Sequence, residues 1–96
     1  MTTFTVSYKR TGDLAKGTRT YDTISYARKR ACATMLKDKK NRIYIFRDGM
    51  LDNTMFREDG TYYCMAEKPV SNDRYHNVPV VIDPKTGYVR RGWFVR

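Results

Sequence analysis

The sequence predicts an α+β fold: a single helix packed on a mostly antiparallel sheet, in the order ββαβββ followed by a C-terminal β-hairpin. Three observations lead to this prediction. Residues 23–39 carry apolar side chains at helical spacing, whereas the runs on either side alternate with a period of two. Two Asp-Gly pairs, typical of tight hairpin turns, separate the runs that follow the helix. Because 96 residues is close to the commonest domain size, residues 1–96 are expected to form a single compact domain around one core.

Two strands are predicted ahead of the helix. Phe4, Val6 and Tyr8 alternate with polar residues, as in a half-buried strand. A loop containing glycine follows over 11–17, and residues 18–21 are expected to return as the second strand.

The helix is predicted over residues 23–39. Asp22 or Thr23 can cap its start, since a short side-chain oxygen there accepts a hydrogen bond from a free amide of the first turn. Asn41, which tolerates left-handed geometry, is the expected stop. The core face is formed by apolar residues at helical spacing, namely Ile24, Ala27, Ala31 and Met35, flanked by Cys32 and Leu36.

A three-stranded meander is predicted after the helix. The expected strands are 42–47, 50–57 and 61–66. The Asp-Gly pairs at 48–49 and 59–60 suit type I′ turns, in which both central residues need positive φ. Asp52-Asn53 is a poor strand interior, so a bulge or bend is expected there.

A hairpin is predicted to close the chain. The polar segment 67–79 is long enough to cross the domain before it. The hairpin strands are expected at 80–82 and from Tyr88 onward, around a turn in which Gly87 supplies the left-handed position.

The composition indicates a strongly basic cytoplasmic protein. Nineteen Lys and Arg against ten Asp and Glu give a formal net charge of +9, and such a field attracts polyanions or acidic protein surfaces. Cys32 and Cys64 lack the spacing of a disulfide framework, and the N-terminal residues alternate instead of forming a signal peptide. We therefore expect reduced thiols, a cytoplasmic location and no membrane partner.

The sequence carries no motif for catalysis or for ligand binding. One His and two isolated Cys do not form a metal site, and His76 lies in a polar loop where a solvated side chain is expected. The acidic pairs, Glu58 with Asp59 and Asp48 with Asp52, are better explained by turns. We expect no enzyme activity, no cofactor and no metal.

The stretch from Tyr26 to Lys40, YARKRACATMLKDKK, carries six basic residues and one acid. At about 100° per residue, one set of side chains faces away from the core, and we call it the basic band: Tyr26, Lys29, Arg30, Lys37 and Lys40. It can be simply the solvated side of an ordinary helix. Against that interpretation, no acid in the band offsets the repulsion among its bases. Charge is also segregated, since residues 28–42 hold seven bases and one acid while 48–67 hold five acids and one base.

A second basic cluster lies at the end of the sequence, with Arg90, Arg91 and Arg96 around Trp93. Aromatic rings stack on bases and arginine binds phosphate, so this mixture suits a surface for single strands or RNA. The same residues also fit a last strand whose Trp93 fills the core.

Two functions fit this pattern, and the sequence does not separate them. The leading one is a small nucleic-acid-binding module, for DNA or RNA, that acts through electrostatics and stacking. The alternative is a non-enzymatic accessory or inhibitor protein, of phage or mobile-element type, whose basic helix binds an acidic surface of a partner protein. An edge strand at 88–95 could also pair two copies into a homodimer. Either partner would contact the same candidate residues, Tyr26, Lys29, Arg30, Lys37, Lys40, Arg42, Arg90 and Arg91.

Overall fold

The computed structural model describes residues 2–10, 19–66 and 79–94, and it describes side chains up to residue 89. The loop expected at 11–17 and almost all of the polar segment 67–79 lie outside the described residues.

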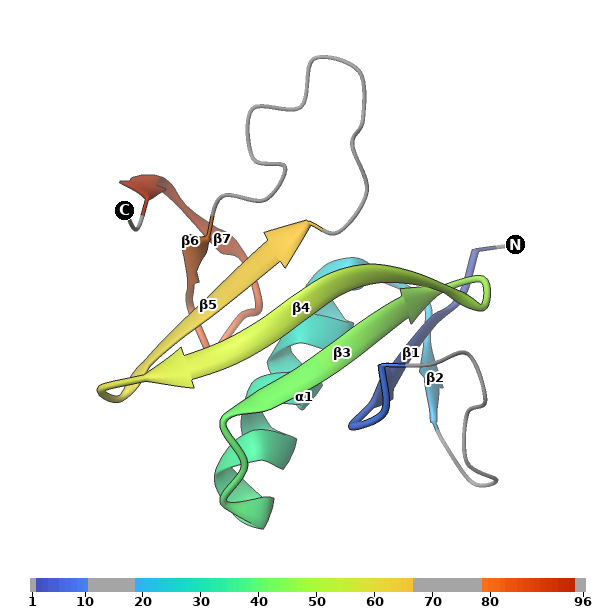
Figure 1. Cartoon of the computed structure of the whole chain (residues 1–96). Helices are drawn as coiled ribbons and strands as arrows, with labels where there is room; N and C mark the ends of the chain where they lie inside the picture. Colours follow the sequence, from blue (N-terminus) through green and yellow to red (C-terminus); the bar gives the residue numbers. More distant parts are fainter. Residues whose placement is uncertain (1, 11–18, 67–78, 95–96) are drawn as a thin grey trace.

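One helix lies against one face of a single antiparallel sheet (Figure 1). The elements in chain order are β1 (Phe4–Ser7), β2 (Thr20–Tyr21), α1 (Ile24–Asp38), β3 (Arg42–Arg47), β4 (Met50–Glu58), β5 (Thr61–Ala66), β6 (Val80–Ile82) and β7 (Val89–Phe94). The sheet has the strand order β2-β1-β3-β4-β5-β6-β7, and every neighbouring pair is antiparallel. The predicted α+β class and the order ββαβββ with a closing hairpin are therefore confirmed.

The two ends of α1 are fixed by different chemistry. Thr23 caps the start, because its hydroxyl accepts a hydrogen bond from the amide of Tyr26 at 3.3 Å. The end differs from the prediction: Lys39, with a φ of 55°, is the left-handed residue, and not Asn41. The amide of Lys39 donates to the carbonyl of Leu36 at 3.4 Å, and such bonds help to offset the roughly 1–2 kcal/mol that a left-handed residue costs.

Two Asp-Gly turns shape the central meander as predicted. The positive φ angles are 48° at Asp48, 84° at Gly49, 51° at Asp59 and 79° at Gly60. Positive φ at both central residues gives a turn whose twist matches that of the strands it joins. The register of β3 to β5 is therefore set locally.

The predicted irregularity at Asp52-Asn53 is a β-bulge. Ile45 of β3 pairs with Asn53 of β4, whereas the next residue, Phe46, pairs with Leu51. Asp52 is the extra residue between them, and it has no partner on β3.

The core lies between α1 and one face of the sheet. A cross-strand row of apolar residues runs over four strands and consists of Ile43, Met55, Cys64 and Val80. The helix faces this row with buried, mostly small side chains, namely Ala27, Ala31, Cys32 and Met35. Two alanines that are 0% exposed bring the helix backbone close to the strands.

The neighbouring cross-strand rows point to the other side of the sheet, which we call the open face because α1 does not cover it. One of these rows consists of Arg42, Phe56, Tyr63 and Val81. A second row consists of Ser7, Tyr44, Thr54 and Met65. The helix and the open face therefore lie on opposite sides of one layer of strands (Figure 1).

The turn between β6 and β7 packs against the first turn of α1. The amide of Gly87 donates to the carbonyl of Asp83 at 2.7 Å, and Gly87 has a φ of +80°, as the sequence predicts for the left-handed position. A Cβ at this position would lie 1.8 Å from the carbonyl oxygen of Ser25. Only glycine fits between the turn and the helix.

We expect Gly87→Ala to lower the free energy of unfolding by roughly 2–5 kcal/mol, because it combines backbone strain with overlap against the helix. Gly60→Ala is the matched control: its φ is +79°, yet a Cβ there meets nothing within 4 Å. The control should lose only about 1–2 kcal/mol. Urea unfolding measures both values, and equal losses would contradict the proposed packing of the turn on α1.

Candidate functional site

The basic band lies on the side of α1 that faces away from the sheet. The side chains of Lys29, Lys37 and Lys40 are exposed, Arg30 is half-buried, and Tyr26 is 47% exposed. Arg42, at the start of β3, is exposed and follows the helix end directly. The structure therefore brings six of the eight predicted site residues to α1 and the chain segment that leaves it.

Tyr26 is held at the start of the basic band by two neighbours. Its ring meets that of Tyr21 edge to face, with 5.3 Å between the centroids and 72° between the planes. The Lys29 Nζ lies 6.0 Å from the centroid of the Tyr26 ring. A cation near a tyrosine face is weakly attracted to it, so this contact orients Lys29 without removing its charge.

Leu36 was expected at the edge of the core face, and this expectation is wrong. Leu36 is 57% exposed, because the last turn of α1 extends beyond the sheet, as Figure 1 shows. An apolar side chain therefore lies in solvent between the core and the basic band.

Three acids of the described residues accept hydrogen bonds from groups other than these bases. Asp38 accepts a hydrogen bond from the hydroxyl of Tyr8, Asp48 from the amide of Thr3, and Asp83 from the amide of Lys85. Within the described ranges, no carboxylate forms an ion pair with a base of the basic band. The positive charge of the band is consequently left for solvent or for a partner.

Tyr8 connects the end of β1 to the last turn of α1. Its hydroxyl lies 2.8 Å from Oδ2 of Asp38 and 3.1 Å from the carbonyl oxygen of Thr34. Partial burial, followed by the hydrogen bond and the charge of Asp38, raises the pKa of Tyr8 to about 12. The helix end that carries Lys37 is therefore tied to the sheet.

Arg42 belongs to a stacked row that our sequence analysis missed. Its guanidinium carbon lies 6.0 Å from the centroid of the Phe56 ring. Phe56 in turn stacks on Tyr63, with 5.2 Å between the centroids and 26° between the planes. The period-two alternation of the strands could have indicated this row, because Arg42, Phe56 and Tyr63 each lie next to a core position and so face the other side of the sheet.

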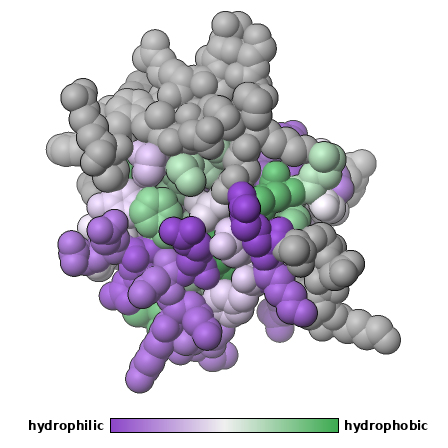
Figure 2. All heavy atoms as spheres, viewed as in Figure 1, coloured by the Kyte–Doolittle hydropathy of each residue, from purple (hydrophilic) through white to green (hydrophobic). Residues whose placement is uncertain are grey.

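Figure 2 shows the molecule from the side of the open face. Hydrophilic side chains gather over the lower part of the view, where Figure 1 places the end of α1 and the start of β3. Hydrophobic residues remain visible among them. The end of α1, which extends beyond the sheet, is therefore visible from the side of the open face (Figure 1).

Arg90 and Arg91 are not shown to join this surface. Both belong to β7, the edge strand next to β6, and their side chains lie outside those described. The same holds for the side chain of Trp93, and Arg96 and His76 lie outside the described residues altogether.

Both thiols of the chain lie in the core, where burial disfavours the thiolate form. Cys32 and Cys64 are both buried, and burial raises the pKa of Cys32 to about 12 and raises that of Cys64 as well. Among the residues with described positions, no group of three His, Cys, Asp or Glu side chains could hold a metal ion.

Comparisons with protein-family models, curated proteins and solved structures found no significant match to this chain. The described residues contain no helix with the length and apolar character needed to cross a membrane.

We expect the phenol of Tyr8 to titrate later than an ordinary tyrosine. The folded chain holds this proton to a pH of about 12, against 10.0 for an unperturbed tyrosine, so the wild type loses the corresponding stability as the pH rises between these values. Tyr8→Phe lacks this loss, because it has no proton to release at this position. Ultraviolet titration and urea unfolding between pH 9 and pH 12, roughly the window of tyrosine ionisation, measure both effects. A Tyr8 that ionises like the unfolded chain would contradict the contact with Asp38.

Proposed function

We propose that this protein is a small, non-enzymatic, cytoplasmic nucleic-acid-binding module. The basic band and Arg42 would contact phosphates of DNA or RNA. One observation carries the proposal: exposed bases run from Lys29 to Arg42 along α1 and its exit, and no described carboxylate neutralises them.

The electrostatics of the helix support this assignment over an ordinary solvated face. Arg30 and Lys37 lie two turns apart on the same side of α1, so their like charges repel with no acid of the basic band between them. Asp38 lies next to Lys37 in the chain, but it accepts the hydrogen bond of Tyr8 instead of pairing with a lysine. Phosphates of a bound nucleic acid would relieve the repulsion and release counterions.

One observation favours the alternative, a partner protein with an acidic surface. Leu36 is 57% exposed beside the basic band, and apolar residues rimmed by charge are common in protein interfaces. In this alternative the chain acts as an accessory or inhibitor protein of phage or mobile-element type. The edge position of β7 also leaves a strand able to pair with a second copy of the chain.

We expect affinity for duplex DNA to fall with salt. If the four bases of the basic band and Arg42 each contact a phosphate, the logarithm of affinity falls with the logarithm of salt concentration at a slope of roughly −4 to −5. The double variant Lys37→Glu/Lys40→Glu should reduce the magnitude of that slope by about 2 and weaken binding. Fluorescence anisotropy at several salt concentrations measures both quantities.

Arg19→Glu/Arg47→Glu is the matched control. Both residues are exposed and lie outside α1, and each double reversal changes the formal net charge from +9 to +5 (9 − 4). The control should retain the wild-type slope. Equal losses in the two variants would mean that only net charge matters. A flat salt response, together with a lysate protein whose capture survives nuclease treatment, would favour the alternative.

A further inference from the structure

The open face carries a stacked row of side chains that does not pack against α1. Rows alternate between the two faces of the sheet, and the row of Arg42, Phe56 and Tyr63 lies on the side that the helix does not cover. Its members contact one another: the guanidinium carbon of Arg42 lies 6.0 Å from the centroid of the Phe56 ring, and the centroids of Phe56 and Tyr63 lie 5.2 Å apart.

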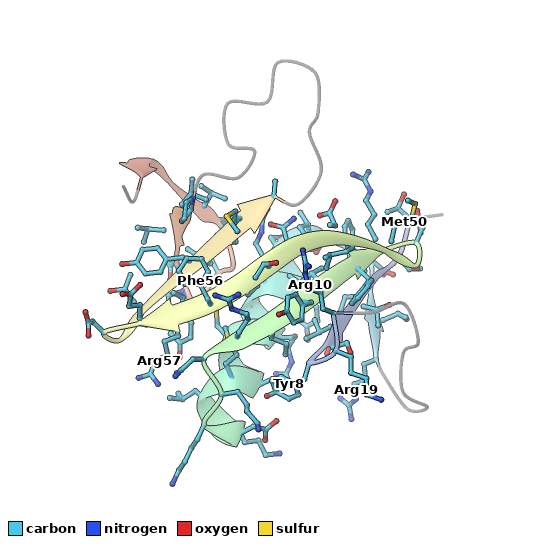
Figure 3. The ribbon with its side chains drawn as sticks, in the orientation of Figure 1. Tyr8, Arg10, Arg19, Met50, Phe56 and Arg57 are labelled. Carbon is cyan, nitrogen blue, oxygen red and sulfur yellow. The ribbon has the colours of Figure 1, made fainter. Side chains whose placement is uncertain are left out.

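The middle of the open face is closed to solvent. Phe46 and Thr54, in its middle, are only 1% and 2% exposed. Phe56 and Tyr63 are half-buried and Arg42 is exposed. By contrast Tyr62, the neighbour of Tyr63 on the helix side, is only 7% exposed. Parts of both rings and the guanidinium of Arg42 are therefore accessible at the start of β3 and the end of β4, where Figure 3 labels Phe56.

The charge around this row fits a polyanion. Arg42 follows Lys40 and the end of the basic band with only Asn41 between them. Arg10, beyond the end of β1, lies over β3 and β4 in Figure 3 and adds a further base on this side. Glu58 is the acid nearest to the row in sequence, at the last position of β4. A nucleic-acid strand whose nucleobases stack on the rings can thus place its phosphates near the lysines at the end of α1.

The chemistry of the row distinguishes single strands from duplexes. Aromatic rings and guanidinium planes bind the faces of nucleobases, and a duplex hides those faces in its own stack. Phosphates, in contrast, are displayed by both forms. A surface with both elements gains extra affinity only from an unpaired strand.

We propose that Phe56 and Tyr63, with Arg42 beside them, form a stacking platform for the bases of single-stranded nucleic acid, and that the platform continues the phosphate-binding basic band. This inference rests on the proposed nucleic-acid function and adds its substrate class. The basic band alone does not distinguish single strands from duplexes, whereas the platform on the open face would favour single strands.

The test compares a fluorescein-labelled thymidine oligonucleotide of about 20 nucleotides, longer than one such site, with a duplex of the same length. Phe56→Leu and Tyr63→Leu keep an apolar side chain but remove the ring. Each should weaken binding to the single strand by about tenfold to a hundredfold, the usual effect of losing one stacking ring, and should change duplex binding less than about twofold. The salt slope should stay that of the wild type, because no phosphate contact is removed.

Three controls make the outcome decisive. Tyr88→Leu removes a ring that is 64% exposed outside the platform, and it should bind both ligands like the wild type. Tyr63→Phe keeps the ring and should retain single-strand binding. Circular dichroism and urea unfolding establish that the Phe56 and Tyr63 variants are folded at the assay temperature.

The two proposals fail in different ways. If Phe56→Leu and Tyr63→Leu bind the single strand like the wild type, the platform is wrong while the phosphate-binding role of α1 stands. Equal losses on single strand and duplex would also overturn the platform. If the wild type binds neither nucleic acid, the proposed function itself fails.

Discussion

The close packing of α1 on one face of the sheet is the constraint on which the rest of the structure depends. Ala27 and Ala31, both 0% exposed, let the helix approach the row of Ile43, Met55 and Cys64. Because this contact decides which side of the helix is buried, it also decides that Lys29, Lys37 and Lys40 face solvent. The same contact uses only one face of the sheet, and so α1 leaves the other face uncovered.

The segment between α1 and β3 joins the two surfaces that result. Lys39 reverses the chain in left-handed geometry, and the amide of Arg57 donates to the carbonyl of Asn41 at 2.9 Å as the chain enters the sheet. Tyr8 fixes the helix end from the other side through Asp38. Lys40 and Arg42 therefore lie on the segment that connects the end of α1 to the row of Phe56 and Tyr63. Hydrogen bonds of Lys39, Asn41 and Asp38 hold the backbone of this region.

The sequence predicted those features that depend on local chemistry. The Asp-Gly turns, a cap at Asp22 or Thr23, the glycine at 87 and a bulge or bend at Asp52-Asn53 each follow from what one or two residues allow in their own backbone. Features that depend on tertiary surroundings were missed. Leu36 has core-like spacing but lies where the sheet no longer faces the helix, and Lys39 reverses the chain because backbone bonds outweigh its own preference. The ring pair of Phe56 and Tyr63 becomes visible only when strand register is known.

The bulge in β4 has an evolutionary consequence. After the bulge the even-numbered residues of β4 face the open side, and before it the odd-numbered ones do. Leu51 and Phe56 therefore share the open face. A lineage that lost the codon for Asp52 would turn Met50 and Leu51 to opposite faces of the sheet relative to residues 53–58. That reversal should make this single-residue insertion hard to delete.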